Sequence, residues 1–406
     1  MILSRRAFVA TTLALSATGC QTLRALRDGD GLAPGTFALR GSETVAFTLS
    51  GNHIYLRAML GKTPYAFLFD TAGAAAIVPE VQRALNFEVT GTAQVHGAGD
   101  AAQNAQIVRV PELSFGGLTY RNGSFLVLPL AFLPAEPLPG LRFGGLLGRE
   151  FFETLVTMID YEKSRLIFDE PAGFRADPSA TVLPLALIDG HPNVRAAVGG
   201  DWGQFDIDAG SRAGVTISRL FANSSGLSKE LGRTIDVIVA HGVGGIVTGS
   251  AARATSLTLG NLRLDRPPVL IADSSGGAFA NANLAGNIGG EILRRFRLTL
   301  DVQNAKLYLR PNARIGEPFA FNHAGLFSER KDGIETVLLV VPTSPASEAG
   351  VAAGDAIGTL DGVEIAHLTG DQVAAAWQRP PGTAVRLELR RDGRAVRAGF
   401  VLRDII

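Results

Sequence analysis

Two short stretches, FLFDTAG at Phe67–Gly73 and FDIDAGS at Phe205–Ser211, decide how the rest of the chain is interpreted. In each, a mostly apolar stretch typical of a strand ends in an aspartate, Asp70 or Asp208, and a turn of small residues follows. Both stretches occupy the same place in a longer unit that occurs twice. The sequence therefore predicts two similar half-sites, each with one carboxylate at the end of a strand.

The repeat keeps its internal spacing, which makes a chance origin hard to sustain. His53 precedes Asp70 by the same interval as His191 precedes Asp208. We interpret the repeated histidines as partners of backbone groups in turns, and the repeated Asp160 and Asp301 as structural turn residues. Other matched pairs are HGAG at 96–99 with HGVG at 241–244, LSFG at 113–116 with LTLG at 257–260, LGRE at 147–150 with IGGE at 288–291, and LIF at 166–168 with LYL at 307–309.

Length and composition limit the fold classes and partners that this chain can have. The chain has 406 residues, 46% hydrophobic and 19% charged, with a net charge of zero and a pI of about 7.0. This length predicts two or three domains. A nucleic-acid-binding protein would need a basic stripe, so we expect no nucleic-acid partner. The 48 glycines and the scarcity of long helical periods favour a turn-rich, mainly β fold.

We expect two homologous β lobes followed by a third domain. The predicted ranges are 35–171 for lobe 1, 172–180 for the join, 181–311 for lobe 2 and 313–406 for the last domain. Pro79–Leu85 is predicted to be a short helix, and a helical turn is expected from Gly290 to Leu293–Phe296. The predicted strands are Val45–Leu49, His53–Leu60, Tyr65–Asp70, Ile107–Phe115, Ser124–Leu128, Val156–Asp160, Val194–Val198, Gln204–Asp208, Ile235–Val239, Ala254–Leu259, Val269–Ile271 and Leu298–Val302.

The amino terminus resembles a twin-arginine export signal that ends in a lipobox. Ser4-Arg5-Arg6 precedes an apolar stretch, and Cys20 follows Gly19. We expect residues 1–20 to be the signal, 21–34 a linker, and Cys20 the site of lipidation, which implies a periplasmic protein anchored to the membrane only through that lipid. Ordinary cleavage that discards Cys20, or an uncleaved anchor, remain alternatives. Cys20 is the only cysteine, so no intramolecular disulfide is possible.

The last 90 residues or so resemble a bacterial PDZ domain. The resemblance rests on SPASEAG at 344–350, GDAI at 354–357 and LDG at 360–362. PDZ domains add an extended peptide to a sheet edge as a further strand. The resemblance implies a peptide loop at Gly325, Leu326 and Phe327, and a C-terminal peptide as a possible ligand. The alternative is that the domain only packs on the lobes or spaces them.

Residues 40–311 resemble the pepsin/retropepsin aspartic proteases, in the bacterial form joined to a PDZ domain. A later apolar-apolar-glycine strand accompanies each acidic turn in that family, and here it is Leu146–Gly148 and Asn287–Gly289. The resemblance implies that Asp70 and Asp208 are catalytic and that no metal or cofactor is used. It further implies an active-site turn of Thr71, Ala72, Gly73, Ala209, Gly210 and Ser211, and covering flaps that contain His96, Gly97, Gly99, His241, Gly242 and Gly244.

The chemistry of such a site needs two carboxylates. Peptide hydrolysis without a metal requires a general base for water and a general acid for the carbonyl oxygen and the leaving amine. Two carboxylates about 3 Å apart share one proton, because both cannot easily ionise. The ionised aspartate then accepts the proton of water while the other donates.

The chain departs from the family pattern at two positions. Ala72 replaces a glycine in lobe 1, and Ala209 replaces a threonine or serine in lobe 2. We expect Ala72 to place a methyl group where the backbone needs unusual angles or a close approach. We also expect the loss of a hydroxyl at Ala209 to raise the pKa of a carboxylate, and hence a working pH nearer neutral.

Three functions stay open from the sequence. The first is a monomeric endopeptidase that acts on peptides or unfolded proteins, with the PDZ domain binding peptide. The second is a protease-derived protein that binds peptides without turnover, which the two alanines favour. The third places each lobe against the same lobe of another chain. A serine or cysteine hydrolase is disfavoured because the chain has no GxSxG motif and no thiol besides Cys20.

Overall fold

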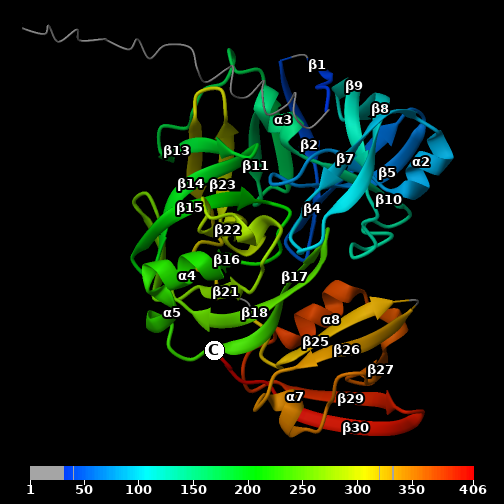
Figure 1. Cartoon of the computed structure of the whole chain (residues 1–406), viewed down its shortest axis with the longest axis vertical. Coiled ribbons are helices and arrows are strands. Elements are labelled where there is room, and N and C mark those ends of the chain that lie inside the picture. Colours follow the sequence, from blue (N-terminus) through cyan, green and yellow to red (C-terminus); the bar gives the residue numbers. More distant parts are fainter. Residues whose placement is uncertain (1–31, 40, 320, 332) are drawn as a thin grey trace, which may run out of the picture.

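The computed structural model describes residues 32–39, 41–319, 321–331 and 333–406. Within these residues the strands form three sheets of nine, fifteen and six strands, so the fold is mainly β, as the sequence predicted (Figure 1). The predicted signal and the lipidation site at Cys20 lie outside the described residues. Among the helices of the described residues, none is both long and apolar enough to cross a membrane.

The nine-stranded sheet builds lobe 1. Asp70 directly follows strand β5 (Thr63–Phe69), which is joined to β4 (His53–Leu60) by a tight hairpin at Gly61. Six of the eight β4 side chains are buried, because this strand is covered on both faces. The other elements are β1 (Thr36–Ala38), β3 (Thr48–Ser50), β6 (Ala76–Ile77), α2 (Pro79–Leu85), β7 (Glu88–Val95), β8 (Gln103–Phe115), β9 (Leu118–Val127), β10 (Phe143–Leu147) and α3 (Arg149–Thr154).

Lobe 2 repeats this arrangement. The strand that ends at Asp208 is β15 (Asp201–Asp208), which follows β14 (His191–Val198) as β5 follows β4. The remaining elements of the lobe are β13 (Thr181–Ile188), β16 (Val215–Ser218), α4 (Arg219–Ser225), α5 (Leu227–Glu230), β17 (Ile235–Gly242), β18 (Gly245–Arg253), β19 (Ser256–Leu259), β20 (Leu262–Asp265), β21 (Pro268–Ala272), η1 (Ala278–Ala280), β22 (Gly286–Gly289) and α6 (Gly290–Leu293).

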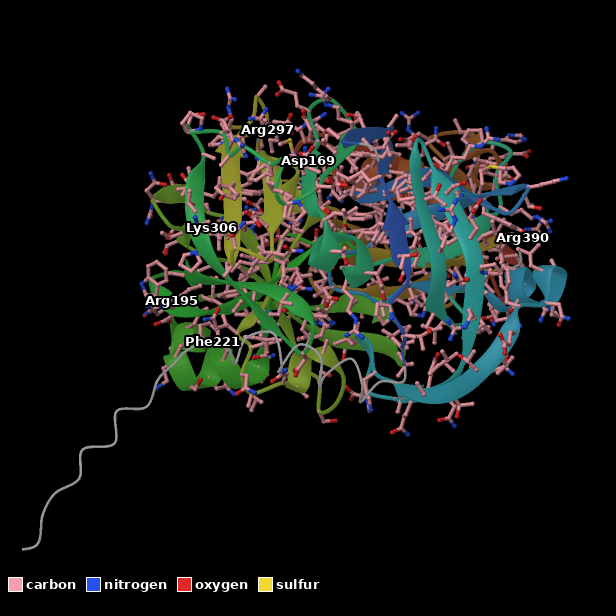
Figure 2. The ribbon with its side chains drawn as sticks, turned by 90° about the horizontal axis from the view of Figure 1, so that it is seen from above. Asp169, Arg195, Phe221, Arg297, Lys306 and Arg390 are labelled. Carbon is pink, nitrogen blue, oxygen red and sulfur yellow. The ribbon has the colours of Figure 1, made fainter. Side chains whose placement is uncertain are left out.

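The two lobes share one continuous sheet, which the division into separate ranges did not anticipate. Lobe 1 contributes β2 (Ser42–Ala46), β11 (Val156–Asp160) and β12 (Arg165–Asp169). Lobe 2 contributes β23 (Phe296–Asp301) and β24 (Lys306–Pro311), and β11 pairs antiparallel with β23. Figure 2 shows this region from above, with Asp169 of β12 and Arg297 of β23 labelled. The shared sheet fixes the lobes relative to each other.

Asp160 and Asp301 are turn residues of this sheet, as predicted. The carboxylate of Asp160 accepts a hydrogen bond from the backbone N–H of Lys163 at 3.1 Å, and that of Asp301 accepts one from Asn304 at 3.2 Å. Each side chain therefore closes the turn between two strands, β11 to β12 or β23 to β24.

The six-stranded sheet builds the last domain. Its core packs the helical side chains of Val373 and Trp377 together with Leu326 and Val337 of the sheet. The elements are β25 (Leu326–Lys331), β26 (Ile334–Val340), α7 (Pro345–Glu348), β27 (Ala356–Leu360), β28 (Val363–Glu364), η2 (Ile365–His367), α8 (Gly370–Trp377), β29 (Ala384–Arg391) and β30 (Arg394–Val401). Helix α8 starts at a capping box of Thr369 and Gln372, in which each side chain bonds the other's backbone.

This domain docks against lobe 2. An apolar cluster joins Val237, Val239 and Val247 of the β17–β18 hairpin to Phe321 and Val341 of the last domain. Figure 1 shows β25 and α8 on the side of that domain that faces β17 and the lobes.

Three local predictions were wrong. The strand predicted over Val45–Leu49 is interrupted at Phe47, which separates β2 from β3. Phe296 begins strand β23, so the helical turn ends at Leu293. The strand predicted from Ala254 begins at Ser256, because the backbone N–H of Ala254 bonds to Pro267 outside the strand ladder.

Candidate active site

The fold holds each aspartate at the end of a buried strand. Strand β5 pairs in parallel with β10, and the N–H of Asp70 donates to the carbonyl of Leu147 at 2.8 Å. Strand β15 pairs in parallel with β22 in the corresponding way. The predicted association of each acidic turn with a later glycine strand is therefore confirmed. Gly148 lies so close beneath the turn that a Cβ atom there would sit 2.0 Å from the carbonyl oxygen of Gly73.

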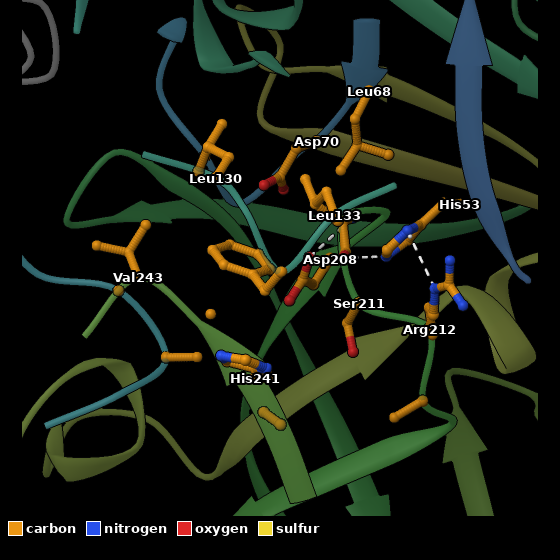
Figure 3. Close-up of a pocket in the computed structure, with 18 of the residues that line it drawn as sticks. His53, Leu68, Asp70, Leu130, Leu133, Asp208, Ser211, Arg212, His241 and Val243 are labelled. Carbon is orange, nitrogen blue, oxygen red and sulfur yellow. Dashed lines mark hydrogen bonds between the residues drawn. The ribbon is translucent and has the colours of Figure 1, made fainter. Parts of the chain in front are cut away.

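The two acidic turns meet within one chain. The backbone N–H of Ala72 donates to Asp70 and that of Gly210 donates to Asp208, both at 2.9 Å. A Cβ atom placed on Gly210 would lie 2.3 Å from the carboxyl carbon of Asp70. The carboxyl group of Asp70 thus lies directly over the turn of lobe 2, and Figure 3 shows both aspartates pointing into the same space.

A threonine hydroxyl fastens the two turns together. Thr71 Oγ1 donates to the carbonyl of Ile207 and accepts from the N–H of Ala209 at 2.8 Å. Ala209 offers no matching hydroxyl, so a single threonine hydroxyl fastens the two turns where the repeat could have supplied two. The hydroxyl bonds backbone and does not reach a carboxylate.

Burial and neighbouring carboxylates raise the pKa of both aspartates. Burial raises the pKa of Asp70. Burial, and then the carboxylates of Asp70 and Asp206, raise the pKa of Asp208 to about 8. A raised carboxyl pKa was predicted, but its cause is burial with Asp70 and Asp206, and not the missing hydroxyl at Ala209. The working pH nearer neutral stays a prediction. The backbone at Ala72 also needs no unusual angles, since its φ is not positive.

The surroundings of the two aspartates differ. In lobe 2, Asn287 Nδ2 donates to Asp208 at 2.7 Å. Asp206 lies opposite Asn287 across the parallel pair, and His191 Nδ1 approaches its carboxylate at 3.6 Å. In lobe 1 the corresponding positions are the apolar Leu68 and Leu146. The site therefore has one polar side and one apolar side.

The two repeated histidines have different environments. His53 Nε2 lies 2.8 Å from the carbonyl of Gly210, and the Nε of Arg212 lies 3.2 Å from His53 Nδ1 (Figure 3). Burial, with help from Arg212, lowers the pKa of His53 to about 3, so this ring is neutral. Burial alone would lower the pKa of His191. The carboxylates of Asp206, Asp70 and Asp208 instead raise it above its usual value. The prediction of backbone partners holds for His53 and is wrong for His191.

The predicted flaps meet above the aspartates. The tips of the β7–β8 and β17–β18 hairpins are joined by two backbone hydrogen bonds, from Gly99 to Val243 at 2.9 Å and from Ala101 to Gly244 at 3.2 Å. His241 stacks on Phe132, with ring centroids 5.4 Å apart. The hairpins thus roof a cavity of about 1630 Å³ with Asp70 and Asp208 in its wall.

The other predicted residues fall into two groups. Ala72, Gly73, Gly210, Ser211, His96, Gly97, His241 and Gly242 line the cavity, and so do Leu326 and Phe327 of the last domain. Thr71 and Ala209 are buried beneath the aspartates, while Gly325 forms the turn before β25 with a φ of +68°. Within the described residues, no group of three or more His, Cys, Asp or Glu side chains could hold a metal ion.

Comparisons with known families agree with this geometry. Residues 56–151 match the family model described as aspartyl protease, and residues 336–391 match that of the PDZ domain. This chain contains an aspartyl-protease-like unit and a PDZ domain. No curated protein matches significantly. Among solved structures, the aspartic proteinase from Irpex lacteus matches with 13% identity and a TM-score of 0.46, over 68% of this chain and 99% of that one.

Several residues of the aspartyl-protease-like unit were missed from the sequence. Asp206 could have been found, because residues two apart on a strand share a face, so it points with Asp208. Its register partner Asn287 lies within the predicted glycine strand, next to Ile288 and Gly289. The loop after β9, with Leu130, Phe132 and Leu133, forms an apolar wall of the cavity, and no periodicity marks it.

Proposed function

We propose that this protein is an aspartic-type endopeptidase whose dyad is Asp70 and Asp208 of one chain. The supporting observation is the contact of the two acidic turns, in which the carboxyl group of Asp70 lies over Gly210. Two carboxylates in this relation hold one proton between them. The loop around Leu130 and Leu133 offers the apolar surface that an extended peptide needs.

The geometry suggests separate roles for the two aspartates. Asp208 faces the carboxylates of Asp70 and Asp206 and holds the proton at neutral pH. Asp70 accepts a proton from water as the water oxygen attacks the peptide carbonyl, and Asp208 donates to the carbonyl oxygen. As the C–N bond breaks, Asp70 gives the proton it took from water to the leaving nitrogen. Asp208 recovers a proton from a hydroxyl of the tetrahedral intermediate, and the products are a carboxylic acid and an amine.

The cellular setting belongs to the same proposal. The twin-arginine motif and Cys20 support export to the periplasm and anchoring through an N-terminal lipid. One chain supplies both carboxylates, which supports action as a monomer. The PDZ domain would bind peptide at the edge of β25, which supports an unfolded polypeptide or a peptide as substrate.

Cleavage of a reduced and alkylated, hence unfolded, protein tests the endopeptidase proposal. We expect the wild type to release peptides between pH 4 and 8, and both Asp70→Asn and Asp208→Asn to abolish release. Mass spectrometry of the products would show internal cleavage. Retained cleavage by either variant would refute the dyad.

A second candidate is a peptide-binding protein without turnover. The absence of a second hydroxyl at Ala209 favours it, because the junction below the aspartates is then less firmly held. A well-folded wild type that binds the unfolded protein but cleaves nothing between pH 4 and 8 would support this candidate.

A further inference from the structure

The cavity that holds the two aspartates does not end at the lobes. It continues into the PDZ domain, between β25 and α8. The PDZ side chains that line it include Leu326, Phe327, Glu329, Val373, Ala374 and Trp377. Catalytic cleft and PDZ groove are thus one continuous space.

The PDZ part of this space can take an extended chain. Among the strands that the structure describes, β25 ends the order of its sheet and pairs only with β26, so its other edge is available for a further strand. Val373 and Trp377 of α8 lie across from that edge and give the groove an apolar floor. A peptide would bond to β25 through its backbone and place alternate side chains against α8.

The direction of such a peptide follows from the PDZ resemblance, which implies that the carboxyl terminus sits at Gly325, Leu326 and Phe327, where β25 begins. Asn322 Oδ1 accepts hydrogen bonds from the N–H groups of Ala324 and Gly325, which holds the turn at the start of the strand. A carboxyl terminus seated at the turn leaves the preceding residues to run along β25 toward Lys331. The peptide then leaves the groove where Arg330 bonds the backbone of Leu368, just before α8 begins.

That end of the groove touches the protease unit. Asp371, in the first turn of α8, pairs with Arg212 at 2.8 Å and also bonds Ser50 of lobe 1. Glu329 of β25 lies 3.4 Å from His241 of the lobe 2 flap. Arg212 in turn contacts His53, which contacts the carbonyl of Gly210 in the catalytic turn. A chain leaving the groove is therefore beside the catalytic cleft.

We propose that one substrate chain occupies both parts, with its carboxyl-terminal tail on β25 and its scissile bond at the aspartates a fixed distance upstream. The inference rests on the proposed endopeptidase function and names its substrate class: polypeptides with a free, extended carboxyl tail. The tail covers the six residues of β25. It then spans the distance from Asp371 through Arg212 and His53 to Gly210. At about 3.3 Å per residue, the cut falls on the order of ten residues from the carboxyl end.

Peptides of one repeated apolar sequence test whether the cut lies at a fixed distance from the carboxyl end, because they offer the same side chains at many positions. We expect the wild type to release a carboxyl-terminal fragment of constant length, measured by mass spectrometry. Adding five residues at the carboxyl end should move the cut five residues along the sequence. A cut that stays at a constant distance from the amino terminus, or that falls evenly along the chain, would overturn the inference.

A pair of variants on one helix provides the matched control. Ala374 lines the groove, whereas the neighbouring Ala375 is exposed and does not. Arginine is a good helix former at both positions. Ala374→Arg should lower kcat/KM by at least about tenfold, because the tail no longer raises the local concentration of the scissile bond. Ala375→Arg should leave kcat/KM and the fragment length unchanged. Equal effects of the two variants would contradict the proposal.

A readout without catalysis separates this inference from the proposed function. In Asp208→Asn, a peptide with a photo-crosslinking residue ten positions from its free carboxyl end should label the flap near His241. Ala374→Arg introduced into Asp208→Asn should abolish the labelling. Labelling without any cleavage by the wild type would refute the proposed endopeptidase function and support the proposal that one chain occupies both parts of the cavity. Cleavage that neither Ala374→Arg nor tail extension affects would support the endopeptidase function and refute the proposal that one chain occupies both parts of the cavity.

Discussion

Replacing Gly210 by alanine would displace the carboxyl group of Asp70, one member of the proposed dyad, by a distance that follows from the structure. The added Cβ would lie 2.3 Å from Cγ, 2.4 Å from Oδ1 and 2.6 Å from Oδ2 of Asp70. Ordinary contact begins at 3.4 Å, so the carboxyl group of Asp70 must move by about 1 Å. The φ of Gly210 is not positive, so alanine brings no backbone strain of its own. The effect should be confined to the position of Asp70.

A displacement of about 1 Å in a catalytic group costs roughly 100-fold in rate, or about 2.7 kcal/mol in the activation free energy. We expect Gly210→Ala to lower kcat by this factor, with KM and the thermal midpoint little changed. The assay is steady-state cleavage of a single peptide substrate, with circular dichroism to monitor folding.

Two further variants are controls for Gly210→Ala. Gly214→Ala, in the same segment, adds a Cβ whose nearest neighbour is 3.5 Å away, and should retain full activity. Ala72→Gly, at the corresponding position of lobe 1, should also leave an active enzyme. Full activity in Gly210→Ala would refute the face-to-face arrangement of the turns.

Three other changes test separate parts of the site. Thr71→Val leaves the backbone groups of Ile207 and Ala209 without their buried partner, so the free energy of unfolding in urea should fall by about 2 kcal/mol, whereas Thr71→Ser should restore it; an unchanged stability would remove the threonine from the lobe junction. Asn287→Leu removes a hydrogen bond that favours ionised Asp208 and is worth about 1.5–3 kcal/mol, so the alkaline limb of the pH–rate profile should move up by about 1–2 pH units. A downward shift would contradict the assignment of this limb to Asp208. The raised pKa of Asp208 contributes stability that is fully present below the unfolded value near 3.8 and is lost as the pH rises through about 8; Asp208→Asn should therefore gain stability over the wild type between pH 4 and pH 8, and a constant difference in urea midpoint would refute the raised pKa.

The sequence predicted the elements that depend on local patterns. Helix α2 was predicted to its residue limits, because Pro79 occupies its first turn and Asn86 ends it in a left-handed conformation. The repeat placed Asp70 and Asp208 on equivalent strands. Strand and turn patterns are local and were therefore visible without a structure.

Long-range pairings and docking were not visible in the same way. The pairing of β11 with β23 joins strands from two repeats, and no local pattern encodes it. The contact of Arg212 with Asp371 exists only because the PDZ domain docks on the lobes. The cause of the raised pKa of Asp208 lies in burial and in Asp206, which requires the packed structure to recognise.

The central claim, that one chain supplies both catalytic carboxylates, is tested most directly by mixing the two inactive variants. Asp70→Asn and Asp208→Asn are assayed alone and after joint unfolding and refolding, beside the wild type treated alike. The one-chain dyad predicts an active wild type, with no cleavage by either variant or by their mixture. Activity that appears only in the mixture would show that the aspartates of different chains form the site, and would contradict the account.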